Sequence, residues 1–468
     1  MPNSLRLMTF FFGSALLACS ATRTAGQTAT SEPSPVSTQA TPGYTKAAPM
    51  PLPTAPASSS AASGVLLMFP PNAATSREIF TTGNGAANTN AGPNGAAGNK
   101  ASHSSAIPHN PGGNIPGLLT VPTFAGAFAA QGGPSAGGVF PYIMIGNNPL
   151  LGGKTEIPAK ITTISLNLQN VPAGFSASVP FSFEDLLTDS PNFEETDYTS
   201  GHHIQFGDAV QRAEFFNTMG DNWHTILDPN IVSRVTIDIP RHVQVQLPDK
   251  SIVTVQSYFV GKAPDGTEFI ELLDLVFNNL FFNQAVNDIN ANNYTTDAFN
   301  MQAWPNTFLF SIDTHGNPVP GLVLGFHTYI LDPSQTPEPR WIFAFSSWIS
   351  PGLFSGGFQD VTALSHETSE ALNDPFGNTP VPRWQFPGQP PTSTACQGNL
   401  ETGDPVEVLP DATVNITLKE RHEVFTYHPQ TEALLQWFEM GATSDAIGGA
   451  FSYPNTTALT QSAVPCPQ

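Results

Sequence analysis

Charged residues, and basic ones above all, are scarce in this 468-residue chain. Only 11% of the residues are charged, 16 Lys and Arg stand against 37 Asp and Glu, and the formal net charge is −21. The first 115 residues contain five basic and two acidic side chains, so the negative charge belongs to the remainder. A body this acidic repels phosphate backbones. We therefore expect no nucleic-acid partner and regard divalent cations as more natural ligands.

Long apolar runs are missing as well, apart from a short one near the start. Residues 7–18 (LMTFFFGSALLA) follow Arg6 and are uncharged, too short to span a bilayer but typical of a signal peptide. We predict a signal peptide over residues 1–18 and an exported chain. The run ends in Leu16-Leu17-Ala18-Cys19, which resembles the bacterial lipobox. That resemblance implies lipidation of Cys19 and a lipoprotein anchored to a membrane at the cell envelope or outer surface; plain secretion is the alternative.

Cysteine is rare, with three residues in the chain. If Cys19 carries the lipid, Cys396 and Cys466 remain as an even pair. A disulfide between them is the default expectation in an oxidising compartment, and two unpaired thiols are the alternative.

Proline and glycine are abundant, with 45 and 39 residues, and they concentrate in a polar N-terminal stretch. Residues 20–113 consist largely of Ser, Thr, Ala, Pro, Gly and Asn, which cannot bury enough apolar surface to offset chain entropy. We predict a disordered tether over residues 19–114 and a folded body, of one or two domains, over residues 115–468.

Apolar periodicity within the body alternates between strand and helix patterns without a regular βαβ rhythm. Helical patterns cover residues 207–219, 268–286 and 359–373. Strand patterns cover residues 164–168, 235–239, 243–247, 252–260, 307–312, 321–331 and 341–347, and residues 423–427 with 433–438 read as a hairpin. We predict an α+β fold with a mixed, mainly antiparallel sheet.

The third helical segment contains the sequence His366-Glu367-Thr368-Ser369-Glu370. Residues four apart lie on one helical face, so His366 and Glu370 can bind one metal ion, and Glu367 lies beside a water on that metal. Core spacing places Leu364, Thr368 and their neighbours on the buried side, and the three site residues on the opposite half. A carboxylate in place of a second histidine can bind Zn²⁺, and it also suits Ca²⁺, Mg²⁺ or Mn²⁺.

The sequence that follows, Asn373-Asp374-Pro375-Phe376-Gly377-Asn378, extends the motif, and Pro375 forces Asp374 out of the helical region. Together the two segments resemble the HELAE–TDP motif of secreted bacterial proteins associated with zincin-type metallopeptidases. A weaker likeness, through Phe376-Gly377-Asn378 and the two late cysteines, connects the chain with phosphate-induced (EXORDIUM-like) secreted proteins of plants. The zincin resemblance implies a zincin-like active-site helix, with His366 and Glu370 as metal ligands and Glu367 as the catalytic base.

A third metal ligand is still needed. Glu401 and Asp404 lie 31 and 34 residues after Glu370, in a turn that suits oxygen ligands. Asp374 is the rival, because it ends the same helix. We favour Asp404 or Glu401 over Asp374, and all three have an alternative role as turn-forming or capping acids.

The remaining histidines and nucleophiles offer no second catalytic motif. We interpret His202 and His203 as solvated loop residues, and His327, His422 and His428 as structural. No Gly-x-Ser-x-Gly turn and no phosphate-binding glycine loop is found, so serine and cysteine hydrolases are disfavoured.

Two functional hypotheses follow from these patterns. The first is an exported, lipid-anchored zinc metallopeptidase that acts on external or periplasmic polypeptides, which bind by strand addition along residues 341–347. The second is a non-catalytic surface binding or adhesion lipoprotein with a structural metal or none.

Overall fold

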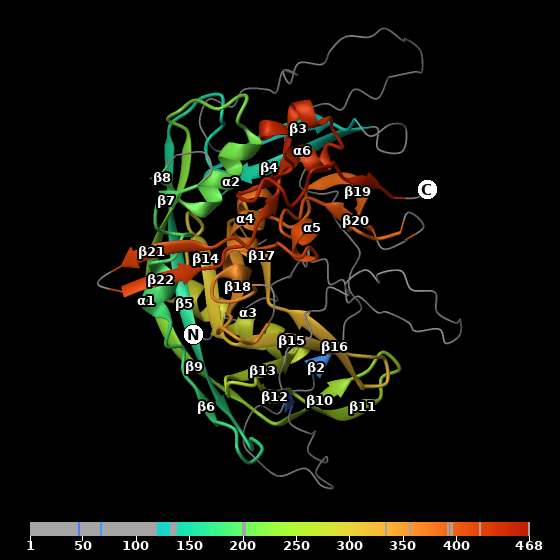
Figure 1. Ribbon diagram of the computed structural model, residues 1–468. Helices are drawn as coiled ribbons and strands as arrows, with labels where there is room; N and C mark the ends of the chain where they lie inside the picture. Colours follow the sequence, from blue (N-terminus) through green and yellow to red (C-terminus); the bar gives the residue numbers. More distant parts are fainter. Residues whose placement is uncertain are drawn as a thin grey trace.

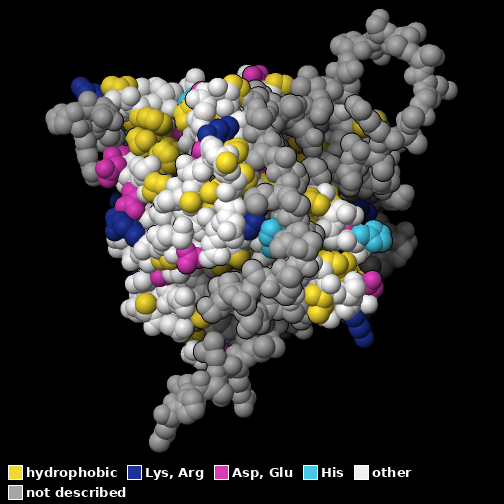
Figure 2. Space-filling view, turned by 90° about the horizontal axis from the view of Figure 1, so that it is seen from below, with side chains coloured by type: hydrophobic (Ala, Val, Ile, Leu, Met, Phe, Trp, Pro, Cys, Tyr) yellow, Lys and Arg dark blue, Asp and Glu magenta, His cyan; other side chains and the backbone are white. Residues whose placement is uncertain are grey.

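The computed structural model describes residues 45–46, 66–67, 119–131, 138–198, 203–332, 335–354, 357–390, 393, 396–420 and 423–466. The predicted signal peptide, Cys19 and nearly all of the predicted tether lie outside these residues. None of the helices in the described part of the chain is long and apolar enough to cross a bilayer. Figure 2 shows one face of the molecule, on which charged side chains are few and scattered among uncharged ones.

A mixed central sheet organises the fold (Figure 1). Its strands run in the order β17, β18, β14, β5, β9, and β6 adds to the far end of β5. The strands are β5 (Lys154–Leu168), β6 (Ser178–Val179), β9 (His224–Ile239), β14 (Phe299–Pro305), β17 (Gly325–Leu331) and β18 (Arg340–Trp348). Neighbours β18, β14, β5 and β9 pair in parallel, whereas β17 is antiparallel to β18. The central strand β14 is buried at every position, as expected for a parallel strand that is covered on both faces.

Two helices cover opposite faces of this sheet, α3 (Asp274–Asn290) and α4 (Thr362–Asn373). Successive side chains of a strand point to opposite faces. On β18, Phe343 and Phe345 pack with Phe281 and the rest of the α3 side, while Ile342 and Ala344 pack with the α4 side. This alternation fixes α4, which carries the HETSE sequence, against β17 and β18.

Smaller sheets flank the central one. A five-stranded sheet and a three-stranded sheet lie beside α3 (Figure 1). Their strands are β1 (Thr45–Lys46), β12 (Tyr258–Lys262), β13 (Glu268–Leu273), β15 (Thr307–Ile312) and β16 (Pro318–Val323) in the first, and β11 (Ile252–Gln256), β10 (His242–Gln246) and β2 (Leu66–Leu67) in the second. Most of the strand pairings in the described residues are antiparallel, and the α+β prediction with mixed sheets is confirmed.

The C-terminal residues pack beside the N-terminal hairpin of the body and over α4 (Figure 1). The remaining helices and strands of the described residues, in chain order, are β3 (Thr123–Ala129), β4 (Val139–Ile145), α1 (Glu184–Thr188), β7 (Thr196–Asp197), β8 (His203–Ile204), α2 (Phe206–Glu214), β19 (Pro380–Gln385), β20 (Cys396–Asn399), α5 (Asp404–Glu407), β21 (Ile416–Glu420), β22 (Glu423–Tyr427), β23 (Glu432–Ala433), α6 (Leu435–Phe438), the 3₁₀ turns η1 (Thr443–Asp445) and η2 (Ile447–Gly449), β24 (Ser452–Tyr453) and β25 (Val464–Pro465). The predicted disulfide joins Cys396 to Cys466, with a Cα–Cα distance of 6.2 Å. It attaches the end of the chain to β20.

Several predicted elements differ from the structure because strand pairing overrides local pattern. Residues 268–273 of the predicted second helix form β13, held between β12 and β15, and the helix begins only at Asp274. The predicted strand 252–260 divides at Ser257 into β11 and β12, which belong to different sheets. The first helix ends at Glu214 rather than Met219.

The predicted C-terminal hairpin is also wrong. Strand β22 pairs with β21, and residues 433–438 divide between the short strand β23 and helix α6.

The predicted addition of a substrate strand along residues 341–347 is also wrong. These residues lie in β18, and its neighbours β17 and β14 occupy both of its edges.

Candidate metal centre

Helix α4 is buried on every side. All twelve of its residues are buried, including His366, Glu367 and Glu370, which were expected to face a cleft. The turn after β20 and the residues around Gln430 cover this half of the helix, as their contacts with Glu370 and His366 show. The helix ends as predicted, since Asp374 before Pro375 has the non-helical backbone angles φ −139° and ψ 68°.

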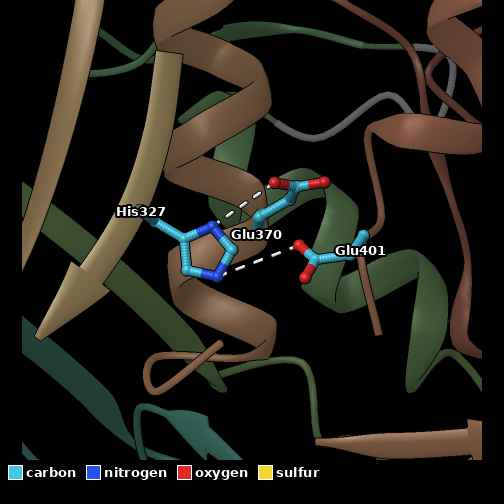
Figure 3. Close-up of side chains that lie close together, drawn as sticks. All are labelled: His327, Glu370 and Glu401. Atoms are coloured by element: carbon cyan, nitrogen blue, oxygen red, sulfur yellow. Dashed lines mark ion pairs between the residues drawn. The ribbon is translucent and has the colours of Figure 1, made fainter. Parts of the chain in front are cut away.

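Six side chains converge beside α4. Helix α4 contributes His366, Glu367 and Glu370, strand β17 contributes His327, the turn after β20 contributes Glu401, and the first residue of α5 contributes Asp404. Figure 3 shows the His327 ring between the carboxylates of Glu370 and Glu401. The chain therefore brings together residues that lie as far as 77 positions apart, from 327 to 404.

Glu370 is the centre of this group. Its Oε1 lies 3.1 Å from His366 Nε2, and its Oε2 lies 3.3 Å from His327 Nδ1. The backbone N–H of Gly403 donates a hydrogen bond of 3.1 Å to Oε1. Both oxygens of one carboxylate thus face ring nitrogens of different histidines.

The two downstream acids predicted as third ligands both approach a histidine. Asp404 Oδ1 lies 3.7 Å from His366 Nε2, and Asp404 Oδ2 accepts a hydrogen bond from Gln397. Glu401 Oε2 lies 4.0 Å from His327 Nε2. The sequence left these two residues as alternatives, and the structure places them beside different histidines.

Asp374 lies outside the group and is occupied by the backbone turn that follows α4. Its Oδ1 accepts hydrogen bonds from Asn378 N at 3.1 Å and Thr379 Oγ1 at 2.9 Å, and its Oδ2 accepts one from Thr379 N at 2.8 Å. This favours the turn-forming role over that of a ligand.

Gln430 fixes the orientation of His366. Its Nε2 donates to the Gly403 carbonyl at 2.8 Å, which turns its Oε1 toward His366 Nδ1 at 3.3 Å. An N–H on Nδ1 therefore donates to Gln430, which leaves Nε2 as the ring nitrogen that faces Glu370 and Asp404. A histidine ligand is commonly held by a partner of this kind on its other nitrogen.

Two glycines allow the close approach of site side chains. A Cβ on Gly403 would lie 2.5 Å from His366 ring atoms, and one on Gly325 would lie 2.5 Å from Glu367 Oε1. Neither glycine has a positive φ that would require the residue on backbone grounds. A side chain at either glycine would therefore collide with His366 or Glu367.

The histidines and carboxyls shift each other's protonation. Burial opposes ionisation of Glu370, but the charges of His366 and His327 outweigh it and hold the pKa of Glu370 well below its usual range. Burial and the charge of Glu370 raise the pKa values of Glu401 and Asp404 well above normal. Burial also raises the pKa of Glu367, although His327 and His366 oppose it.

Burial by itself would lower the pKa of both histidines. The adjacent carboxylates, Glu367 and Glu370 for His327 and Glu370 for His366, raise both pKa values well above normal. Without another cation, each imidazole must therefore hold a proton to balance its neighbours.

His327 is the site residue that sequence reasoning missed, since it was interpreted as structural. It lies 39 residues before His366 in no local motif, and only the pairing of β17 with β18 brings it to α4. A histidine within the apolar strand sequence Gly-Phe-His-Thr-Tyr-Ile-Leu was the one available signal, because a buried imidazole needs partners.

Two other histidines that were interpreted from the sequence, His203 and His428, are among the described residues. His203 is exposed, as expected, and lies 3.5 Å from Asp197, but it belongs to strand β8 rather than to a loop. His428 Nδ1 pairs with Asp360 at 2.7 Å, near the start of α4. His202 and His422 are not among the residues that the structure describes.

The donor set fits a divalent cation. Histidine nitrogens and carboxylate oxygens are the ligands that Zn²⁺ prefers, and two groups of three such residues converge, one donor atom from each lying within 4.8 Å of the others. These groups are His327, Glu370 and Glu401, and His366, Glu367 and Glu370. Two buried atoms, His327 Nε2 and Glu367 Oε2, make no hydrogen bond. Leaving such atoms unpaired costs about 1–3 kcal/mol each.

No family model, no curated protein and no solved structure matches this chain. The function has to be argued from the site.

Proposed function

We propose that this chain is a metal-dependent hydrolase, most simply a zinc peptidase, whose centre is His366, Glu370 and Asp404. The observation that carries the proposal is the convergence of these three residues around His366 Nε2, with Glu367 on the next position of the same helix. The imidazole of His366 in this ligand set favours Zn²⁺ over Ca²⁺, because Ca²⁺ takes oxygen ligands.

Glu367 has the environment of a general base. A bound divalent cation supplies positive charge that lowers the pKa of a water and polarises a carbonyl. Glu367 is buried, its Oε2 makes no hydrogen bond, and burial raises its pKa above the usual range. It takes a proton from the water as the water oxygen attacks the scissile carbonyl carbon. It then delivers that proton to the amine nitrogen as the C–N bond breaks.

Substrate approaches on the side of His366 and Asp404. Their side chains are 11% and 19% exposed, whereas those of His327, Glu367, Glu370 and Glu401 are no more than 6% exposed. The contact with Gln430 fixes the orientation of the His366 ring on this exposed side of the site. A peptide carbonyl is expected to enter there.

Export is part of the proposal. The signal-like segment and the lipobox-like sequence at Cys19 support a site outside the cytoplasm, and we propose polypeptides of the envelope or surroundings as its substrates. The Cys396–Cys466 disulfide is consistent with an oxidising compartment.

A second candidate is a non-catalytic surface-binding lipoprotein in which the cation only stabilises the fold. The burial of five of the six side chains, all but Asp404, favours this alternative. In that case metal removal lowers the melting temperature, and no peptide is cleaved.

The substitution Glu367→Gln separates the two candidates. We expect hydrolysis of casein or a fluorogenic peptide library to fall by about 100-fold or more, the usual worth of a general base, with metal content unchanged. Asp411→Asn, which removes an exposed carboxylate from the same part of the chain, is the matched control and should retain full activity. Undiminished hydrolysis in Glu367→Gln, or a purified protein that holds only Ca²⁺ or no metal, would refute the peptidase proposal.

A further inference from the structure

The two oxygens of Glu370 face two different histidines, and each histidine has its own second acid. His366 Nε2 lies near both Glu370 Oε1 and Asp404 Oδ1. Of the two ring nitrogens of His327, Nδ1 lies near Glu370 Oε2 and Nε2 lies near Glu401 Oε2. We propose that Glu370 bridges two divalent transition cations, one at His366 and Asp404 and a second held by His327 and Glu401. The inference rests on the proposed function in one respect, because Glu370 is a ligand of both cations.

Donor spacing supports both positions. With bonds of about 2.0–2.2 Å, two ligands of a tetrahedral metal lie roughly 3.3–3.6 Å apart. At the first position, Glu370 Oε1 and Asp404 Oδ1 lie 3.1 and 3.7 Å from His366 Nε2. At the second position, Glu401 Oε2 lies 4.0 Å from His327 Nε2, and one donor atom each from His327, Glu370 and Glu401 falls within 4.8 Å of the others, while the 3.3 Å contact of Glu370 Oε2 is with Nδ1 on the other side of the ring. Cations in two-metal sites are typically about 3.5–4 Å apart, a separation that one bridging carboxylate spans.

Charge supports two cations rather than one. Four carboxyl groups, those of Glu367, Glu370, Glu401 and Asp404, lie within 4.0 Å of the two imidazoles. In the described part of the chain, the ion-pair partners of these four are histidines, with no lysine or arginine among them. Two divalent cations offset these four carboxylates when all four are ionised and both imidazoles are neutral ligands, whereas one cation offsets only two, and uncompensated buried charge is costly.

His327 supplies the independent observation that a ligand belongs at the second position. It is 4% exposed, and its Nε2 makes no hydrogen bond although it points to Glu401. A buried ring nitrogen facing a carboxylate at 4.0 Å, too long for a hydrogen bond, is left unsatisfied by the protein alone. His327 and Glu401 approach from β17 and the β20–α5 turn, so this set does not depend on the HETSE helix except through Glu370.

Metal stoichiometry tests the proposal. The mature full-length chain is stripped with a chelator, reloaded with Zn²⁺, and measured by native mass spectrometry and elemental analysis. We expect two Zn²⁺ per chain in the parent and in the control Asp411→Asn, and one in Glu401→Gln and in His327→Asn. Glu401→Gln keeps the size of the side chain, so it serves if His327→Asn does not fold, as judged by circular dichroism.

Mn²⁺ provides a second readout that depends on the bridge. Two Mn²⁺ ions joined by Glu370 should give an exchange-coupled EPR spectrum, and Glu401→Gln should convert it to that of an isolated ion.

The outcomes separate this inference from the proposed function. One Zn²⁺ in the parent, unchanged in Glu401→Gln, overturns the second site and leaves the peptidase proposal standing; it would mean that a protonated His327 simply pairs with Glu370 and Glu401. Two ions that both persist in Glu401→Gln also overturn it. No bound cation overturns both proposals, whereas two bridged ions without hydrolysis support the second site and refute the peptidase.

Discussion

Gly403→Ala is the sharpest structural test of how the site is built. Gly403 has the ordinary helical angles φ −79° and ψ −39°, so alanine causes no backbone strain. Its Cβ, however, would lie 2.5 Å from Cγ and Nδ1 of His366. Carbon and nitrogen atoms in contact need well over 3 Å, so either the imidazole or the 401–404 turn must move by about an ångström.

The magnitude follows from what that movement disturbs. Overpacking a buried contact costs about 1–3 kcal/mol of folding free energy. The shift also breaks the alignment of His366 with Gln430, Glu370 and Asp404, and loss of such support typically lowers metal affinity about 10–100-fold. We therefore expect a lower melting temperature in the apo protein and a weakened Zn²⁺ affinity.

Gly398→Ala is the matched control. Gly398 lies in β20, five residues earlier, and a Cβ there would meet its nearest neighbour, Arg383 Cγ, at an ordinary 3.5 Å. Competition titration with a fluorescent zinc chelator measures both variants. Zinc affinity of Gly403→Ala equal to that of Gly398→Ala would refute the packing of Gly403 against a ligating His366.

Three further predictions concern stability and anchoring. Replacing Cys396 and Cys466 by Ser opens a loop of 70 residues, so chain entropy predicts that the free energy of unfolding falls by about 4 kcal/mol. Denaturant titration measures this change, and an unchanged unfolding midpoint would contradict a stabilising role of the disulfide. Burial, with the charge of Asp445, raises the pKa of Glu439 from 4.5 to about 8. Between these values the unfolded chain is ionised and the folded chain is not, so stability falls by up to about 4 kcal/mol as pH rises from 4.5 to 8. Glu439→Gln should flatten that part of the stability profile relative to the parent, and a parallel profile would exclude Glu439 as its cause. Finally, Cys19→Ser should abolish incorporation of labelled fatty acid and release the chain from membranes; retained label would contradict lipidation at Cys19.

Local chemistry explains which parts of the site the sequence revealed. The pairing of His366 with Glu370 follows from helical periodicity, and the end of α4 follows from Pro375. The turn containing Glu401 and Asp404 was found because acids beside a glycine suit a ligand loop. Each of these signals lies within a segment of a few residues.

Long-range packing explains what the sequence concealed. His327 and Gln430 reach the site only because β17 lies beside β18 and because the segment before β23 folds over α4. The same cause moved residues 268–273 from a predicted helix into β13, where two partner strands decide the conformation. The burial of His366 and both glutamates was also invisible, since an amphipathic pattern shows one apolar face and not what covers the other.

Anomalous X-ray scattering at the zinc edge, from crystals of the Zn²⁺-loaded mature chain, tests the central claim most directly. We predict a peak about 2.0–2.2 Å from His366 Nε2 and a Glu370 oxygen, with a second peak beside His327 and Glu401. Peaks confined to exposed histidines such as His203, with none at Glu370, would contradict the metal centre.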